Sequence, residues 1–248
     1  MIILKSAREI ATMREAGRIA AQFLEMLSSH IRVGVTTGHL SELADSFIRE
    51  HGAYPTFVGY QGYPAAICTS VNDEVVHGIP GTRALRLGDI VSIDVGATYD
   101  GYVGDHAKTF PVDEVSDEAR RLIAVTEESL ARGIAMAQEG AFLGDISHAV
   151  QSHAEENGFS VVRDYVGHGV GRAMHEDPQV PNYGPAGRGI RLRGGLVIAI
   201  EPMVNAGGPE TYVMPDGWTV RTRDRRISAH FEHTLAITAD GPVVLTLP

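Results

Sequence analysis

The chain has 248 residues, of which 44% are hydrophobic, so it can form one large domain or two small ones. It carries 21 lysines and arginines against 31 aspartates and glutamates, and the net charge of −10 argues against nucleic acid or an anionic membrane as the main partner. A single cysteine, Cys68, excludes an internal disulfide and a cysteine-based zinc site. The sequence shows no signal peptide and no apolar stretch of membrane-spanning length, which indicates a soluble cytoplasmic protein.

Two helices are predicted at the start of the chain. Ser6 and Glu9 have the spacing of a capping box, and apolar residues then recur at three- and four-residue steps as far as Leu27. Thr37 is predicted to cap a second helix, which Gly52 ends. The segments predicted next are a loop over 54–64, a short strand over 65–69 and a second loop over 72–81.

Residues 90–110 are predicted to form a β-hairpin that places two carboxylates in an apolar sheet. Asp100 and Gly101 tolerate the positive φ angles of a two-residue turn. With that turn, Asp94 lies opposite Ala107 and on the same face as Asp105, so the two carboxylates are diagonal neighbours about 7–8 Å apart at the backbone. Two buried carboxylates repel each other, and the usual remedies are a shared proton, an arginine or a metal.

The pattern of the first half recurs in the second. Long helices are predicted over 116–140 and 144–157, and the glycines at 34, 38 and 52 recur 106 positions later. The apolar strand 88–94, which ends on an acid, recurs at 195–201. A chance match of the glycines is the alternative, but the acid-ended strands favour an internal duplication. We therefore expect one catalytic domain over 1–248 with an α+β fold, in which helix–helix–sheet halves, approximately 1–113 and 114–248, are related by a pseudo-two-fold axis.

The second half adds polar residues to glycine-rich or apolar segments. His168 lies between two glycines, which predicts close backbone packing and an exposed imidazole. Glu201 ends an apolar strand just before a proline. A final strand is predicted over 230–237, with Glu232 in its middle.

Five polar residues from both halves are thus expected in or beside the duplicated sheet: Asp94, Asp105, His168, Glu201 and Glu232. Each alone is more often a satisfied structural group, but the five together predict a cation site. The four carboxylates carry a charge that two divalent ions would balance, and oxygen donors with one imidazole suit Mn, Fe, Co or Zn. A metal pair with open positions activates a bridging water for hydrolysis.

Most other histidines are expected on helix surfaces or helix ends. His230 shares a predicted strand face with Glu232 and is the main rival ligand. His77 and His175 lie in loops that contain glycine and proline, from which a side chain can reach a site on a rigid scaffold. These two are therefore the histidines that could reach a site from outside the predicted strands.

The remaining candidates are basic and aromatic. Four arginines, at 221, 223, 225 and 226, are expected on a solvated strand and turn, with nucleic-acid binding as the minor alternative. Tyr60, Tyr63 and Trp218 are explained equally well as cover for the core or as the wall of a substrate pocket.

Eight segments match the motifs of one known family: VVHGIP (75–80), SIDVGA (92–97), GDHAKTF (104–110), GHGVG (167–171), MHEDPQVPNYG (174–184), IEPM (200–203), DGWT (216–219) and FEHT (231–234). Through these segments the chain resembles, over nearly its whole length, the methionine aminopeptidases of type I in their short bacterial form. The chain lacks the long helical insertion of the type II enzymes.

The resemblance implies the pita-bread (creatinase/aminopeptidase) fold and a cytoplasmic metallo-hydrolase. This enzyme would remove the initiator methionine from nascent polypeptides near the ribosome, through a metal-bridging hydroxide. We expect it to act as a monomer, with no membrane and no specific nucleic acid among its partners. Two divalent ions (Co, Mn, Fe or Zn) would be held by the five residues Asp94, Asp105, His168, Glu201 and Glu232.

The resemblance also implies catalytic roles for His77 and His175. Glu201 is expected to take the proton of the attacking water, because it ends its strand at the open mouth of the sheet. The substrate pocket would involve eight residues: Phe57, Tyr60, Tyr63, Cys68, His77, Met174, His175 and Trp218.

Two other readings share parts of this pattern. Prolidases and Xaa-Pro aminopeptidases have the same five ligands, but they carry a large additional N-terminal domain for which this chain has no room. Relatives that lost their metals act as binding proteins, and the presence of all five ligands argues against that. Gly96, Met174 and Gln61 differ from the residues expected in familiar members, which leaves the shape of the pocket open.

Overall fold

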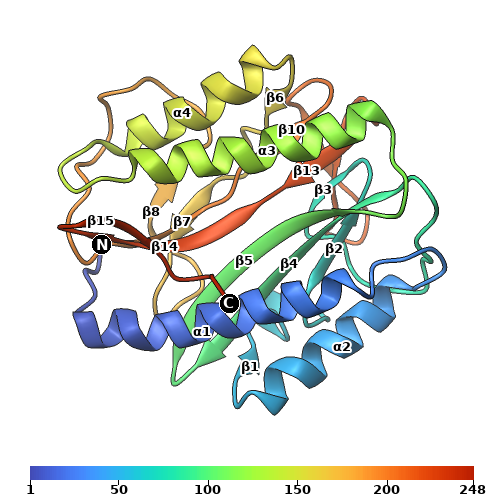
Figure 1. The fold of residues 1–248 in the computed structure, drawn as a ribbon, viewed down its shortest axis with the longest axis horizontal. Helices are drawn as coiled ribbons and strands as arrows, with labels where there is room; N and C mark the ends of the chain where they lie inside the picture. Colours follow the sequence, from blue (N-terminus) through green and yellow to red (C-terminus); the bar gives the residue numbers. More distant parts are fainter.

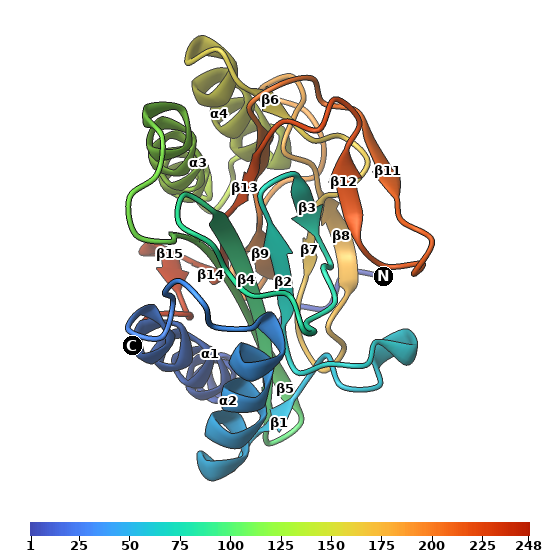
Figure 2. The same cartoon turned by 90° about the vertical axis from the view of Figure 1, so that its right-hand side faces the viewer.

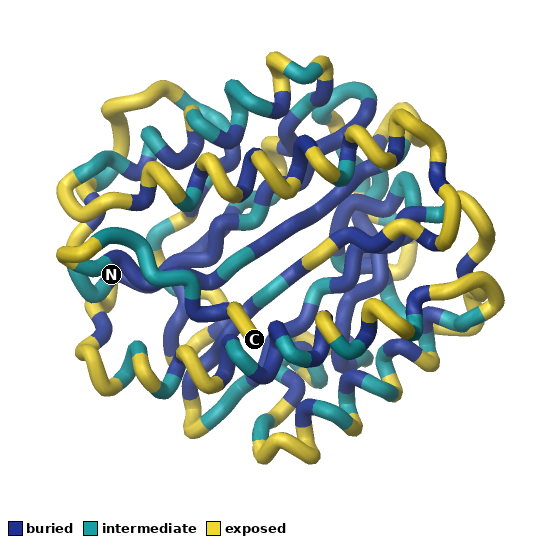
Figure 3. The backbone as a smooth tube through the Cα atoms, viewed as in Figure 1, coloured by how far each residue is buried: buried dark blue, intermediate teal, exposed yellow.

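Four helices cover one face of a curved antiparallel sheet in the computed structural model, which describes residues 1–248 (Figures 1 and 2). The helices are α1 (Ala7–Ser28), α2 (Thr37–Glu50), α3 (Asp117–Met136) and α4 (Leu143–Glu156). Their outer faces are exposed, whereas the central strands are buried along most of their length (Figure 3). No helix has both the length and the apolar character needed to cross a membrane.

The strands form one large sheet and two small ones. The nine-stranded sheet has the order β1-β4-β5-β14-β9-β7-β8, with β2 also paired to β4 and β15 to β14. The small sheets have the orders β13-β10-β6 and β11-β12-β3. The strands are β1 (Tyr54–Pro55), β2 (Cys68–Val71), β3 (Glu74–Val76), β4 (Ile90–Tyr99), β5 (Tyr102–Pro111), β6 (Ser160–Val161), β7 (Gly167–Gly169), β8 (Glu176–Val180), β9 (Val197–Ile200), β10 (Met203–Asn205), β11 (Thr211–Val213), β12 (Val220–Thr222), β13 (Ser228–His230), β14 (Glu232–Thr238) and β15 (Gly241–Val244).

The first hairpin has the predicted register. Strands β4 and β5 pair over ten positions, and Asp94 lies opposite Ala107. Both turn residues have positive φ angles, 46° at Asp100 and 75° at Gly101. Because side chains alternate along a strand, Asp94 and Asp105 project from the same face, as expected.

The duplication is visible in repeated backbone hydrogen bonds. The N–H of Gly88 donates to Val112, and the N–H of Gly195 donates to Ile237 in the same way. These glycines share a φ of 88°, which glycine adopts without strain. The glycines at 34, 52, 140 and 158, which follow the helices or their loops, also have positive φ angles. The halves are therefore built on one plan, while their treatment as a single catalytic domain stays a prediction.

The second hairpin runs in one register through two pairs of strands. Met203 of β10 pairs with His230 of β13, and Ile200 of β9 pairs with His233 of β14. Between these pairs the ladder is interrupted where Pro202, which has no N–H, lies opposite Phe231. The prediction of one strand over 230–237 with Glu232 in its middle is therefore wrong. Glu232 is the first residue of β14, at the break.

The two halves of the large sheet meet where β5 lies beside β14, and we call this junction the seam. Only Ala107 with Glu232 and His106 with His233 pair directly there. On each side of these two pairs, a threonine hydroxyl, instead of a backbone group, forms the hydrogen bonds between the strands. Thr234 Oγ1 accepts from the N–H of Asp105 at 3.0 Å and donates to its carbonyl at 2.8 Å, and Thr109 Oγ1 bonds both backbone groups of His230 at 2.9 and 2.8 Å.

Each chain end crosses to the opposite half. The N–H of Lys5 donates to the carbonyl of Gly195 at 2.7 Å, and the Lys5 ammonium forms a buried ion pair with Glu176 of β8. At the other end, the Leu245 carbonyl lies so close to α1 that a Cβ on Gly17 would be 2.5 Å from its oxygen. Both ends therefore tie the halves together beyond the seam.

Several predicted boundaries shift by a few residues. Thr36 rather than Thr37 caps α2, with its hydroxyl accepting from the N–H of His39 at 3.2 Å. Strand β2 begins at Cys68 instead of residue 65, and the two predicted loops contain β1, a short 3₁₀ helix at Tyr60–Gly62 and β3. Helix α3 ends at Met136 instead of residue 140. Short strands of this kind depend on pairing with distant segments, which local sequence does not encode.

Candidate metal centre and substrate pocket

One cavity of about 310 Å³ gathers every residue proposed for the site. Asp94 lies between Ile93 and Val95, which pack under α1 and α2, so the cavity is on the face of the sheet opposite these helices. Its lining comprises Phe57, Tyr60, Gln61, Tyr63, Cys68, His77, Asp94, Asp105, His168, Met174, His175, Glu201, Trp218 and Glu232. Of these, only Gln61 was not assigned to the site by the sequence.

Four carboxylates and one imidazole form the polar end of the cavity. Ligand atoms of Asp105, His168 and Glu232 all lie within 4.8 Å of one another. His168 Nε2 is 3.7 Å from Asp105 Oδ2 and 3.5 Å from Glu201 Oε1. Asp94 lines the same cavity from β4. The structure thus brings the five predicted ligands together from four strands and the end of a fifth.

The imidazole of His168 is oriented so that its lone pair faces these acids. His168 Nδ1 lies 2.9 Å from the carbonyl of Gly169, which can only accept, so Nδ1 carries the proton. Nε2 is then an unprotonated acceptor pointing at carboxylates that are acceptors too. Hydrogen-bond acceptors that face one another with no donor between them are typical of a site that binds a cation.

The prediction of an exposed imidazole at His168 is wrong. His168 is only 6% exposed. A Cβ on Gly167 would meet the carbonyl oxygen of Ala199 at 2.4 Å, and one on Gly169 would meet that of Asp177 at 2.2 Å. The two glycines allow β9 and β8 to pack closely against the backbone on either side of His168. The predicted close backbone packing is therefore confirmed, but it buries the imidazole instead of exposing it.

The acids have no lysine or arginine as an ion-pair partner, only histidines. Asp94 Oδ1, Asp105 Oδ1 and Glu232 Oε1 are buried and have no hydrogen-bond partner. Burial raises the pKa of Asp105 to about 7, and burial together with the neighbouring carboxylates raises the pKa of Glu201 and Glu232 well above their usual range. Burial also lowers the pKa of His168 to about 3.

These observations fit divalent cations. Unsatisfied buried polar atoms are costly, about 1–3 kcal/mol each, and more for charged groups. A nearby positive charge restores the ionised form of a carboxylate and uses the lone pairs that are orphaned here. The donor set, oxygens with one imidazole, belongs to metals such as Mn, Fe, Co and Zn rather than to thiolate-binding sites.

Two neutral imidazoles stand at the border between the acids and the apolar wall. His175 Nδ1 lies 2.6 Å from the Tyr60 hydroxyl, and its ring centroid is 4.2 Å from that of His168. Burial lowers the pKa of His175, and burial together with the nearby His175 ring, which opposes a second positive charge, lowers the pKa of His77 to about 4. His77 has a φ of 60°, a left-handed backbone conformation that a non-glycine residue adopts at an energetic cost.

Aromatic and sulfur-bearing side chains close the other end of the cavity. Tyr63 packs edge-on against Trp218 at 5.0 Å between ring centroids and against Phe57 at 6.4 Å. The Tyr63 hydroxyl donates to the carbonyl of Gly78 at 2.9 Å, which ties this wall to the loop of His77. Trp218 lies on the turn between β11 and β12, where its backbone N–H donates to Asp216 Oδ1 at 2.9 Å.

Gly96 packs directly against the phenyl ring of Phe57, with no room for a side chain between them. A Cβ at residue 96 would be 2.8 Å from Phe57 Cε1 and 3.0 Å from Thr56 Cβ. No side chain fits there while Phe57 keeps its position. Gly96, one of the three departures named in the sequence, is therefore a packing partner of the pocket wall, two residues from Asp94.

Sequence reasoning did not assign two neighbours of the site. Tyr165 packs edge-on against His77 at 5.7 Å between ring centroids. Gln61, which lines the cavity, has a φ of 49° in the 3₁₀ segment beside Tyr60. The sequence signal for Tyr165 is its place three residues before His168, and the signals for Gln61 are its place beside Tyr60 and its departure from familiar members.

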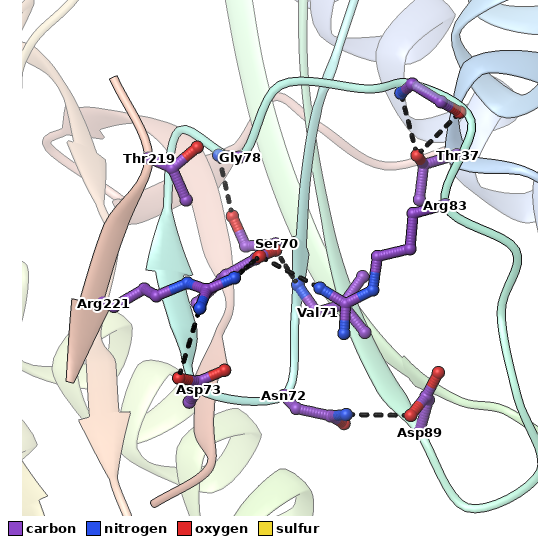
Figure 4. A network of polar contacts seen from close by, with 12 residues as sticks. Thr37, Ser70, Val71, Asn72, Asp73, Gly78, Arg83, Asp89, Thr219 and Arg221 are labelled. Atoms are coloured by element: carbon purple, nitrogen blue, oxygen red, sulfur yellow. Dashed lines mark hydrogen bonds and ion pairs between the residues drawn. The ribbon is translucent and has the colours of Figure 1, made fainter. Parts of the chain in front are cut away.

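The arginine run does not lie wholly in solvent as expected. Arg221 Nη2 bonds Glu74 Oε1 at 2.7 Å, and Arg83 Nη1 bonds the same oxygen at 2.9 Å. Figure 4 shows Arg221 reaching toward Asp73 and Arg83 approaching from the opposite side, near Val71. This network fastens β12, which leads to Trp218, onto β3. Arg221 is therefore structural, because its partners come from distant parts of the chain.

Comparison with known proteins places the chain in a family. The model of metallopeptidase family M24 matches residues 11–239. Methionine aminopeptidase 1 of Bacillus subtilis is 54% identical over 246 residues, which cover 99% of each chain. Methionine aminopeptidase of Clostridium perfringens is 52% identical over 247 residues, which cover 100% of this chain and 99% of that one.

Solved structures agree. A methionine aminopeptidase from Rickettsia prowazekii superposes with a TM-score of 0.98 and 45% identity, covering 100% of both chains. The prolidase of Pyrococcus furiosus matches at 23% identity with a TM-score of 0.79, covering 99% of this chain and 66% of its own, and so shares the fold. The expected pita-bread fold is confirmed by these matches. The chain belongs to metallopeptidase family M24 and is similar throughout to its methionine aminopeptidases.

Proposed function

We propose that the protein is a metal-dependent aminopeptidase that hydrolyses the N-terminal methionine from nascent polypeptides. The observation that carries this is a single cavity with unpaired buried carboxylates at one end and a wall of aromatic and sulfur-bearing side chains at the other. The close similarity to methionine aminopeptidases over the full chain supports the same activity. We further propose that it works as a cytoplasmic monomer, on chains emerging near the ribosome.

Asp94, Asp105, His168, Glu201 and Glu232 would hold the divalent ions. Their four carboxylates balance the charge of two such ions, for which Co, Mn, Fe and Zn are the candidates. When bound, such ions supply Lewis-acid chemistry, which lowers the pKa of a water and stabilises developing negative charge.

The chain's own residues would divide the remaining work. Glu201 would take the proton of the attacking water, because it follows the last residue of β9 and is not fixed within a ladder. If the Tyr60 hydroxyl donates to Nδ1 of His175, the proton of that imidazole is on Nε2, where it can donate to the substrate carbonyl. His77 would bind the substrate amide and help to protonate the departing nitrogen.

The apolar end of the cavity would hold the methionine side chain. Phe57, Tyr60, Tyr63, Cys68, His77, Met174, His175 and Trp218 surround it. A flexible, polarisable thioether makes favourable contacts with aromatic edges. The narrow slot left by Phe57, Tyr63 and Trp218 suits an unbranched side chain better than a branched one.

Chelation and substrate choice test this proposal. Removing the metal should abolish hydrolysis of a Met-Ala-Ser peptide, and adding Mn, Fe, Co or Zn should restore it. The peptide Leu-Ala-Ser and N-formylated Met-Ala-Ser should be poor substrates. Hydrolysis of Xaa-Pro dipeptides instead would indicate a prolidase, and metal binding without any turnover would indicate a binding protein. Activity in a sample shown to be free of metal would refute the proposal.

A further inference from the structure

The carboxylate of Glu201 lies between two imidazoles. Its Oε1 is 3.5 Å from His168 Nε2, and its Oε2 is 3.7 Å from Nε2 of His230. His168 belongs to the proposed ligand set. His230 does not belong to the group of Asp105, His168 and Glu232 whose ligand atoms converge within 4.8 Å. Its one ion-pair contact within 4 Å is with Glu201 Oε2, the oxygen that does not face His168.

His230 is buried and firmly held, yet its Nε2 is unpaired. The residue is 1% exposed, and Thr109 Oγ1 bonds both its N–H and its carbonyl across the seam. Met203 pairs with it on the other side. Nε2 is buried without a hydrogen-bond partner. A buried polar atom without a hydrogen-bond partner is rare in a folded protein, and Glu201 Oε2, 3.7 Å away, is an acceptor that can serve as its partner.

The duplication places His230 at the position of a metal ligand. Asp105 lies opposite Gly96 in the first hairpin, and His230 lies opposite Met203 in the second. Gly96 and Met203 correspond at the same offset that relates Asp94 to Glu201. Thr234 holds the backbone of Asp105 as Thr109 holds that of His230. The same framework therefore presents a carboxylate to the acids in one half and an imidazole in the other.

We infer that His230 is a positioning residue for Glu201: its Nε2–H donates to Oε2 and leaves Oε1 for the metal and the proton. The inference rests on the proposed function, because it takes Glu201 to be a ligand. The present separation exceeds an ordinary N–H···O distance by about 0.5 Å. Catalytic hydrogen bonds are often long until the site is loaded. Ligating carboxylates and histidines usually have such outer partners, whose removal costs about 10–100-fold in metal affinity or activity.

Titration of the metal-free protein with Mn²⁺ in a calorimeter tests this directly. His230→Ala should bind the same number of ions as the wild type, with about 10–100-fold weaker affinity at one of them. His230→Gln, whose amide N–H can reach Glu201, should recover most of that loss. In the reloaded enzyme, His230→Ala should lower kcat with little change in KM for Met-Ala-Ser.

Controls separate the possible outcomes. His233→Gln removes a histidine of the neighbouring strand β14, whose Nδ1 lies against Thr246 Oγ1 instead, and should bind Mn²⁺ as the wild type does. Thr109→Val, which releases the backbone of His230, should show a smaller version of the His230→Ala effect. If His230→Ala does not fold, the Mn²⁺ affinities of His230→Gln and His230→Leu are compared instead. Gln has an N–H donor and Leu is apolar and of similar size, so His230→Gln should bind Mn²⁺ more tightly.

Two results would overturn the inference. Unchanged affinity and kcat in His230→Ala would show that Glu201 needs no such partner. Loss of one ion per chain in that variant would make His230 a ligand. A wild-type protein that binds no Mn²⁺ would instead refute the proposed function, so the two failures are distinct.

Discussion

The two hairpins share a backbone plan but differ in how they end. The first consists of two unbroken ten-residue strands joined by Asp100 and Gly101. The second is 18 residues longer, because Asp94 corresponds to Glu201 at an offset of 107 while their facing positions, Ala107 and Glu232, differ by 125. The additional residues form β11 and β12 and carry Trp218 to the pocket.

This difference gives the halves different tasks at one site. Asp94 and Asp105 lie within a continuous ladder, where neighbouring hydrogen bonds fix the backbone on both sides. Glu201 and Glu232 flank the interruption at Pro202 and Phe231, where the proline has no N–H to donate to the ladder. Among the acids only Asp94 and Glu201 correspond. On the proposed function, we therefore expect the first half to anchor metal and the second to supply the proton acceptor.

The largest effect should come from neutralising these two corresponding acids. Asp94→Asn should lose metal and, with it, nearly all turnover, because a rigid ligand position cannot readjust to a neutral donor. Glu201→Gln should keep a good part of the metal, since an amide oxygen still coordinates, but lower kcat by about 10²–10⁴ because it cannot accept a proton. Metal content by atomic emission and kcat for Met-Ala-Ser report the two effects.

Similar behaviour of Asp94→Asn and Glu201→Gln would contradict this division of roles between the halves. Equal metal loss in both would mean that the halves share the anchoring role. Near-normal turnover in Glu201→Gln would leave Glu201 as a ligand only.

The next effect concerns the histidines at the border of the pocket. His175→Ala should lower kcat by about 10²–10³, as loss of one donor to a developing oxyanion does, with normal metal content. Tyr60→Phe, which removes only the bond to Nδ1 of His175, should have a smaller effect in the same direction. His77→Ala should lower kcat with its metal intact. Loss of metal in His175→Ala would instead make that residue a ligand.

A smaller effect is expected where the halves differ in packing. Gly96→Ala would place a Cβ against Phe57, whereas the corresponding Met203 of the second half is accommodated and fully buried. Overpacking of this kind should lower the free energy of unfolding by about 1–3 kcal/mol and raise KM for Met-Ala-Ser. Phe57→Leu in the same chain should recover part of the loss in urea unfolding. Simple additivity of the two changes would show that Gly96 and Phe57 are not coupled.

The smallest effect compares two corresponding helix starts. Thr36 caps α2 through its hydroxyl, whereas Phe142 precedes α4 without a side-chain cap and its N–H is taken by Asp145. Thr36→Ala should lower the free energy of unfolding by about 1 kcal/mol at any pH. The pKa of Asp145 is lowered by the N–H groups of Phe142 and Gly187.

The pH dependence distinguishes these caps. A carboxylate whose pKa is lowered by folding stabilises the protein above its unfolded pKa, near 3.9, and loses that contribution as the pH falls toward its folded value. Asp145→Asn should therefore be less stable than the wild type at neutral pH, and this deficit should shrink below about pH 4. A constant deficit would assign the effect to packing rather than charge.

The sequence predicted the first hairpin well because its register is local. Asp100 and Gly101 fix the turn, and the alternation of side chains then decides which residues share a face with Asp94. The second hairpin was harder, since a 30-residue excursion separates Glu201 from Glu232 and the break at Phe231 arises from a proline on the partner strand. No pattern within 230–237 reveals that proline.

Burial and pairing between distant segments also escaped prediction. His168 is enclosed by strands whose approach its flanking glycines permit but do not identify. Arg221 finds Glu74, which lies 147 positions earlier in the chain. The five proposed ligands could be named because charged residues are rare in apolar strands, whereas the orphan Nε2 of His230 becomes visible only once Glu201 is seen beside it.

The crossing of the chain ends has a topological consequence. Lys5 is anchored to Gly195 and Glu176 in the second half, while Leu245 packs on Gly17 in the first. A terminal segment of each half thus packs against the other half. Asp113 and Glu114, in the link between β5 and α3, are exposed. A protease that cuts there would leave two fragments still interlocked, and the cavity they enclose would stay whole.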